Sequence, residues 1–236
     1  LCNQTRILHI ERTLKIRFDG RMIRKILAIG VPNGLENSMF QLGKILVLSL
    51  VTSFGTASIA ANAVSNNIAM FAVLPGMSIG FAMLTVSAQC VGAGDFEQVK
   101  YYTKKLMKLT YICLILMNIL VVLLLPFIIK VYGLSAEASE YARRILIYHS
   151  CCVVTIWPLS FSLANTLRAA ADVKYTMILA IVSMWTFRIG FSYILGSYLK
   201  WGVFGIWVAM TIDWLVRSIC FTIRYLGGKW KHASLV

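Results

Sequence analysis

The first long apolar stretch of the chain, residues 30–50, keeps its polar side chains on one side. On a helix at about 100° per residue, five amide or ionisable residues fall within an arc of roughly 140°. These residues are Asn33, Glu36, Asn37, Gln41 and Lys44. Twenty helical residues are about 30 Å long, which matches the hydrocarbon core of a bilayer. The pattern predicts a membrane-crossing helix with one apolar and one polar face.

Polar groups inside a membrane are costly, so they usually face the interior of a helical bundle or a water-filled cavity. Two interpretations of the polar face are therefore open. Its residues either join neighbouring helices by hydrogen bonds or line a transport cavity.

Five further apolar stretches follow. The six predicted spans cover residues 26–51, 58–90, 108–129, 144–167, 176–199 and 202–223. We expect an all-α membrane protein, a bundle of six transmembrane helices over residues 26–223. A basic linker is expected over residues 1–25 and a polar tail over residues 224–236. Bends are expected at Pro32, at Pro75 with Gly76, and at Pro158, because proline interrupts helical hydrogen bonding.

Composition supports a membrane protein. Of the 236 residues, 59% are hydrophobic and 14% are charged, and the mean hydropathy is +0.77. A soluble domain carries about 25% charged residues. The six cysteines and three histidines are scattered, which indicates neither a disulfide framework nor a metal site. No nucleophile–base pair or phosphate loop is present, so we expect neither an enzyme nor a cofactor.

The predicted membrane topology explains most of the net charge of +14. Sixteen lysines and arginines fall on the side of the termini, four on the other side, and three within spans. An excess of basic residues marks the cytoplasmic side. We therefore expect a multi-pass protein of the cell membrane with both termini in the cytoplasm. Anionic lipid headgroups of the bilayer, and no nucleic acid, would balance the charge.

Ionisable residues inside the spans are candidates for function. Asp213 and Arg217 are four residues apart and can pair on one helix face, and Arg188 is expected to join them. Glu36 and Lys44 are about 12 Å apart along the helix. Glu36 is therefore the carboxylate most available to bind a proton or a cation. Asn66, in the second span, is a further candidate for the substrate or ion pathway.

Four motifs resemble the C-terminal half of MATE (multidrug and toxic compound extrusion) transporters over about residues 21–229. These motifs are GVPNGLENSMFQLGK, IAANAVSNNIAMFAVLPGMSIGFAMLTVSAQCVGAGD, LRAAADVKYTM and GVFGIWVAMTIDWLVRS. The resemblance implies a twelve-helix protein of two lobes around a central cavity. It also implies export of drugs and other small organic substrates in exchange for sodium ions or protons. The partner would be an N-terminal six-helix lobe, and since the chain begins with Leu1 we expect a longer protein.

The chain departs from one branch of that family. The branch carries a cation-binding glutamate about two turns after the first proline, where this chain has Phe40 or Gln41. Its second carboxylate has no counterpart in residues 144–167. The chain is closer to the DNA-damage-inducible type, whose key aspartate belongs to the other half, so the coupling ion is open. Ala169 and Ala171 replace glycines of the family loop, which predicts a stiffer connection.

Two rival functions are left open. A flippase for a lipid-linked or polysaccharide precursor would share the architecture, and the cationic residues Lys44 and Arg188 would suit a pyrophosphate headgroup. A membrane subunit that binds partners without transport is the other rival, although intramembrane polar residues argue against it.

Overall fold

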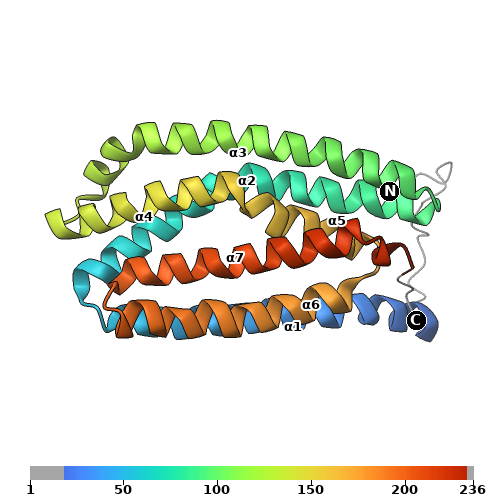
Figure 1. The fold of residues 1–236 in the computed structure, drawn as a ribbon, viewed down its shortest axis with the longest axis horizontal. Coiled ribbons are helices and arrows are strands. Elements are labelled where there is room, and N and C mark those ends of the chain that lie inside the picture. The colour runs from blue at the N-terminus through green and yellow to red at the C-terminus, as the bar shows by residue number, and fades with distance from the viewer. Residues whose placement is uncertain (1–18, 233–236) are drawn as a thin grey trace, which may run out of the picture.

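The computed structural model describes residues 19–232, which form helices joined by short turns (Figure 1). No strand occurs among these residues, which confirms the predicted all-α class. The α-helices are α1 (Gly20–Thr52), α2 (Thr56–Gly92), α3 (Phe96–Tyr132), α4 (Ala136–Thr155), α5 (Leu163–Ala169), α6 (Val173–Ser183) and α7 (Gly202–Leu226). The π-helical segments are η1 (Pro158–Ser162), η2 (Met184–Gly190) and η3 (Tyr193–Tyr198), and η4 (Lys229–His232) is a 3-10 helix.

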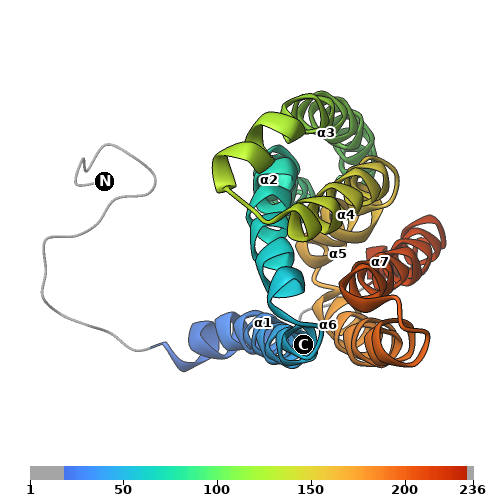
Figure 2. The ribbon, with the colours of Figure 1, turned by 90° about the vertical axis from the view of Figure 1, so that its left-hand side faces the viewer.

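Two of the six predicted spans are built from several segments. α4, η1 and α5 follow one another with a bend of 55° between α4 and the η1–α5 segment. α6, η2 and η3 together form one path from Val173 to Tyr198. The chain therefore runs six times between the two ends of an elongated bundle (Figures 1 and 2).

Most of these helical rods have the length and composition of membrane spans. α2, α3, the α6–η3 path and α7 are long and apolar enough to cross a membrane, and the bent α4–α5 path would make a fifth. α1 is not among them, because amide and ionisable side chains interrupt its apolar run. The crossing predicted for α1 stays a prediction.

Helix ends follow capping residues rather than the edges of apolar runs. The start predicted for the third span, residue 108, is wrong: α3 begins at Phe96, so Lys100, Lys104, Lys105 and Lys108 are helical and not in a loop. The Asp95 carboxylate caps this helix by accepting a 3.0 Å hydrogen bond from the Gln98 backbone. α4 likewise begins at Ala136, not at residue 144, and Ser135 is its N-cap.

α1 also begins earlier than the predicted span. Its first residue is Gly20, and the Asp19 carboxylate caps it with a hydrogen bond of 2.9 Å from the Arg21 backbone. The end of the predicted linker is therefore helical. Residues 1–18 of that linker and residues 233–236 of the predicted tail lie outside the described residues.

The bend predicted at Pro158 is confirmed. Pro158 is the first residue after the break and has no N–H to donate to the preceding turn. Trp157 beside it is only 5% exposed and packs against Gly76 of α2, where a Cβ atom would lie 2.5 Å from the tryptophan ring. Gly80, one turn further along, faces Asn165 of α5 in the same way. The two glycines let α2 approach the bent path closely.

The other two prolines do not end their helices. α2 continues through Pro75 and changes direction around its middle (Figure 1). α1 continues through Pro32.

Aromatic residues fill the centre of the bundle. Trp207 and Trp214 of α7 are both buried, and His149 of α4 lies edge-on to them at ring-centroid distances of 5.2 and 5.6 Å. The indole N–H of Trp207 donates a 3.1 Å hydrogen bond to the Asn62 side chain of α2. These contacts join α2, α4 and α7 without leaving the Trp207 indole unpaired.

The two ends of the bundle differ in charge. The start of α1, the α2–α3 turn, the α5–α6 turn and the end of α7 all lie at the same end (Figure 1). This basic end carries the lysines at the start of α3 together with Arg168, Lys174 and Arg224. The sorting of basic residues by end agrees with the topology predicted from the sequence.

Candidate functional site

Most of the polar face of α1 is exposed in this chain. Asn37, Gln41 and Lys44 are exposed, and Asn33 is half-buried. The Asn37 amide donates a 2.9 Å hydrogen bond to the Asn33 carbonyl of its own helix. Within residues 19–232, neither Gln41 nor Lys44 forms a hydrogen bond with another helix. These side chains therefore do not join the helices of this bundle.

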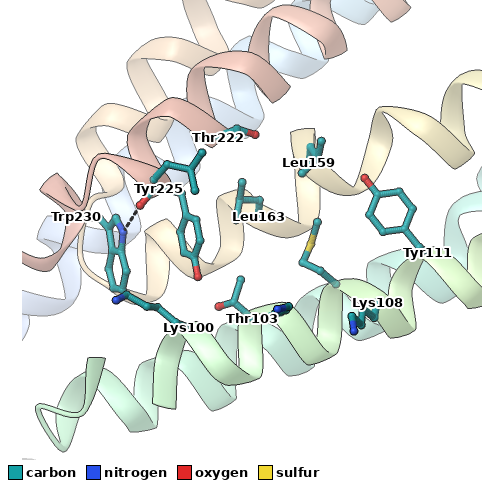
Figure 3. A pocket seen from close by; sticks show the side chains of 12 residues that line it. Lys100, Thr103, Lys108, Tyr111, Leu159, Leu163, Thr222, Tyr225 and Trp230 are labelled. Atoms are coloured by element: carbon teal, nitrogen blue, oxygen red, sulfur yellow. Dashed lines mark hydrogen bonds between the residues drawn. The ribbon is translucent and has the colours of Figure 1, made fainter. Parts of the chain in front are cut away.

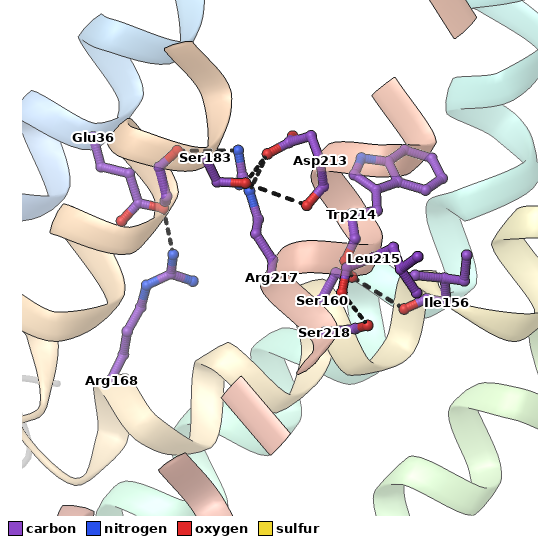
Figure 4. Close-up of polar contacts among 11 residues, drawn as sticks. Glu36, Ile156, Ser160, Arg168, Ser183, Asp213, Trp214, Leu215, Arg217 and Ser218 are labelled. Carbon is purple, nitrogen blue, oxygen red and sulfur yellow. Dashed lines mark hydrogen bonds and ion pairs between the residues drawn. The ribbon is translucent and has the colours of Figure 1, made fainter. Parts of the chain in front are cut away.

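Glu36 differs from its neighbours because it turns into the bundle. Its carboxylate accepts a 2.6 Å hydrogen bond from the Arg168 guanidinium, and the two side chains are 14% and 22% exposed (Figure 4). Arg168 also donates a 3.1 Å hydrogen bond to Asn165. The expectation that Glu36 is the carboxylate most available to a proton or cation did not include this arginine, which neutralises it.

The α5–α6 turn is held on both sides, by Arg168 near the end of α5 and by Asp172 just before α6. Arg168 binds Glu36 of α1, and Asp172 binds Arg224 near the end of α7 through two hydrogen bonds of 2.7 and 3.1 Å. Between them, Ala171 has φ of +64°, a left-handed conformation that costs a residue with a Cβ atom about 1–2 kcal/mol. The stiff connection predicted from the alanines is thus a strained turn tied to two helices.

Asn66 is exposed on the first half of α2. Its amide donates a 2.8 Å hydrogen bond to the carbonyl of Asn62 on the same helix. Like Asn37 on α1, it satisfies one donor locally and faces away from the bundle. α1 and α2 therefore both present exposed amide side chains.

Asp213 lies in a buried cluster with the partner predicted from its spacing. It is 0% exposed and accepts hydrogen bonds from Arg217 Nε at 2.9 Å and from the Ser183 hydroxyl at 2.5 Å (Figure 4). Arg217 also donates to the Ala180 carbonyl at 3.2 Å. The cluster joins α6 and α7 and gives Asp213 a structural role.

Phe40 is the point at which three cationic side chains meet. The charged groups of Lys44, Arg188 and Arg217 lie 5.3, 5.2 and 5.6 Å from the centre of its ring. Such distances allow attraction between a cation and the face of an aromatic ring. Arg188 thus lies near Arg217, as expected, because both guanidinium groups contact the Phe40 ring. With Asp213 as the carboxylate of this cluster, the region has an excess of positive charge.

Ser183 and Arg168 carry no signal in the sequence as site residues, and Phe40 stands out there only as a departure from the family's glutamate. Arg168 is separated from Glu36 by 132 positions, so helical spacing gives no signal for the pair. Ser183 and Phe40 are ordinary residues of apolar helices until their neighbours are known. Among residues 19–232, no group of three or more His, Cys, Asp and Glu side chains is arranged to hold a metal ion.

Comparison with known proteins adds the family. The chain is 26% identical to the "Probable multidrug resistance protein YoeA" of Bacillus subtilis, over 97% of this chain and 49% of that protein. It is 21% identical to the "Probable multidrug resistance protein NorM" of Thermotoga maritima, over 90% of this chain and 46% of that protein. The chain thus spans about half the length of the curated relatives it matches.

The fold is similar to that of solved transporters. A multidrug resistance MATE family transporter of the MOP superfamily, in an outward-facing conformation, superposes with a TM-score of 0.82 at 18% identity. The superposition covers 95% of this chain and 51% of that protein. The relatives are named as transport or resistance proteins and not as enzymes. The MatE family model matches residues 32–194, which is more than half of the chain. The chain therefore belongs to the MatE family.

Proposed function

We propose that this chain is one half of an antiporter that exports drugs or other organic compounds by alternating access. The exposed polar face of α1 is the observation that carries the proposal. Asn37, Gln41 and Lys44 lie on a helix packed among apolar spans, yet all three are exposed and none forms a hydrogen bond with another described helix. Amide and ammonium groups facing lipid tails would be costly. A water-containing cavity shared with a second lobe gives them a favourable environment.

The partner that this proposal requires is a second six-helix lobe. Transporters commonly place the substrate between two structural repeats, and the relatives are about twice as long as this chain. The lobe would pack along α1 and α2, whose exposed amides Asn37 and Asn66 would line the interface. Two unlike lobes would then enclose the central cavity.

The coupling ion, sodium or proton, would bind outside residues 19–232. Two arguments support this. Glu36 and Asp213 are the carboxylates in the middle turns of the described helices, and each is bound to an arginine. Phe40, at or beside the position of the family's glutamate, is surrounded by three cationic groups, which would repel a cation. A coupling carboxylate in the other lobe fits both observations.

The basic end of the bundle would lie in the cytoplasm, so that both termini of the chain are on that side of the cell membrane. Basic residues are enriched on the cytoplasmic side of membrane proteins, and the topology predicted from the sequence assigns sixteen of the 23 to that side. The flippase and the non-transporting subunit are not favoured, because relatives carry multidrug resistance names.

An efflux assay tests the proposal. The full-length protein is expressed in bacteria that lack their main drug exporters, and cells loaded with ethidium are energised. We expect energised cells to export the dye. A sodium ionophore should stop efflux if sodium is the coupling ion, and a protonophore should stop it if the proton is the coupling ion.

Variants of the polar face test the observation itself. Gln41→Met with Lys44→Met should reduce efflux to the level of cells without the protein, since the cavity loses its polar lining. Lys130→Met, at the far end of α3, is the matched control and should export normally. If the double variant is present at normal abundance and exports as well as the unmodified protein, α1 does not line the pathway.

A further inference from the structure

A groove lies at the basic end of the bundle, between the first turns of α3, the η1–α5 path and the end of α7 (Figure 3). Its volume is about 630 Å³. This volume is within the range of sites for small molecules and cofactors, about 300–1,000 Å³. The groove is separate from the polar face of α1, since none of its lining residues belongs to α1 or α2.

Three lysines form one wall of the groove. Lys100, Lys104 and Lys108 follow one another at intervals of four residues on α3, and this spacing places them in a row along one helix face. Lys100 is bound to Glu97 at 2.7 Å. Lys104 and Lys108 form no ion pair with any other described residue. The wall therefore has an excess of positive charge.

Aromatic residues close the same end of the groove. The rings of Tyr225 and Trp230 stack at 5.5 Å, and the Trp230 indole donates a 2.8 Å hydrogen bond to the Tyr225 carbonyl. Figure 3 shows Trp230 beside Lys100 and the Tyr225 ring directed toward Thr103. Tryptophan and tyrosine are enriched where a membrane meets water. The lysines and the aromatic residues together indicate that this end of the groove lies at the depth of the lipid headgroups.

The wall of the groove across from α3 is apolar. Leu159 of η1 and Leu163 of α5 line it, and Met107 and Tyr111 add apolar surface beside the lysines of α3. From Lys100 to Tyr111 the helix rises about 16 Å, which is half the hydrocarbon thickness of roughly 30 Å. The groove therefore has the length of one leaflet, and the lysines cover about 12 Å of that length on its α3 wall.

Two of the helices that line the groove also carry exposed apolar side chains. α3 exposes Ile112 and Leu116, and α7 exposes Ile219 and Ile223, each at least half exposed. None of the residues that line the groove belongs to α1 or α2, whose exposed amides would meet the second lobe. An occupant of the groove would enter from the bilayer, not from the transport cavity.

We propose that this groove binds an anionic phospholipid of the leaflet at the basic end. The phosphate would lie between Lys104 and Lys108, and an acyl chain would run over Met107, Leu159 and Leu163. Basic pockets between transmembrane helices on the cytoplasmic side are known to hold anionic headgroups. The lipid would join α3 to α7 at a place where their side chains leave a space. The site depends on neither the substrate nor the coupling ion of the proposed transporter.

Lipid binding to the purified full-length protein tests the proposal. The protein is delipidated in detergent, and binding of phosphatidylglycerol and of phosphatidylcholine with the same acyl chains is measured by native mass spectrometry. The control is a pair of lysines at the same end but outside the groove. Lys104→Gln with Lys108→Gln should weaken phosphatidylglycerol binding roughly 30-fold, at about fivefold per lysine. Lys105→Gln with Lys174→Gln removes the same charge and should change it less than about threefold.

A second variant tests the apolar half of the groove. Met107→Trp fills the space without changing the charge and should also lose phosphatidylglycerol binding. Equal weakening by the two lysine pairs would mean that net charge alone attracts the lipid, and the site would be refuted. Phosphatidylcholine bound as tightly as phosphatidylglycerol would refute the role of the lysines. Competition by glycerol 3-phosphate at the same concentration would show a soluble anion site instead.

Discussion

The buried Asp213–Arg217 pair predicts a large loss of stability when its negative charge is removed. In Asp213→Asn, the Arg217 guanidinium stays inside the bundle, where its side chain is 4% exposed, without a counter-ion. The Arg188 guanidinium near the same Phe40 ring adds a second positive charge. Breaking a buried pair by removing one partner costs about 3–5 kcal/mol. We therefore expect Asp213→Asn to lower the free energy of unfolding by about this amount.

Thermal unfolding in detergent, followed by tryptophan fluorescence, measures the effect. At about 2–4 °C per kcal/mol, the midpoint should fall by roughly 6–20 °C. Glu97→Gln is the matched control, because it removes the same charge from the Lys100 pair at the surface, where Glu97 is 79% exposed. A pair between exposed side chains contributes little to stability, so the midpoint should hardly change.

A double variant separates the loss of the charge pair from damage to packing. Asp213→Asn with Arg217→Gln removes both charges and should recover most of the lost stability. The reasoning is refuted if the single variant unfolds at the temperature of the unmodified protein. It is also refuted if the double variant is no more stable than Asp213→Asn, because the unpaired arginine would then not be the cause.

Two further predictions concern close packing and the backbone. Gly76→Ala should destabilise the protein by about 1–3 kcal/mol, because the new methyl group overlaps the Trp157 ring. Trp157→Phe, which removes the overlapping atoms, should make Gly76→Ala harmless, and additive losses in thermal unfolding would contradict the proposed clash. Ala171→Gly should raise stability by about 0.5–1 kcal/mol by relieving its positive φ. Ala169→Gly in helical α5 should lower stability by a similar amount. If both glycine variants change the unfolding temperature in the same direction, Ala171 is not strained.

Features that depend on a few adjacent residues could be predicted from the sequence. The all-α class follows from apolar runs of membrane length, and the break at Pro158 follows from a missing N–H. Asp213 and Arg217 pair because residues four apart share a helix face. Each of these predictions needs only the geometry of one helix.

Contacts between distant segments could not be predicted in this way. The span predicted over residues 108–129 follows the apolar run and leaves out the lysines at the start of α3. Their spacing of four residues and the cap at Asp95 define a helix that continues beyond the apolar run. The pair between Glu36 and Arg168 depends on how α5 bends toward α1 after Pro158. A single sequence contains no periodic signal for that approach.

The α5–α6 turn shows how a short motif can act through segments far from it. Arg168 and Asp172 are four residues apart, but they do not pair with each other. One binds Glu36 of α1 and the other binds Arg224 of α7, so the turn connects two helices that are at opposite ends of the chain. The alanines between them have no polar side-chain groups, and Ala171 takes a positive φ where the chain turns into α6. The arginine and the aspartate of this motif therefore contribute to how the bundle is held together at its basic end, in addition to their place on the basic side of the membrane.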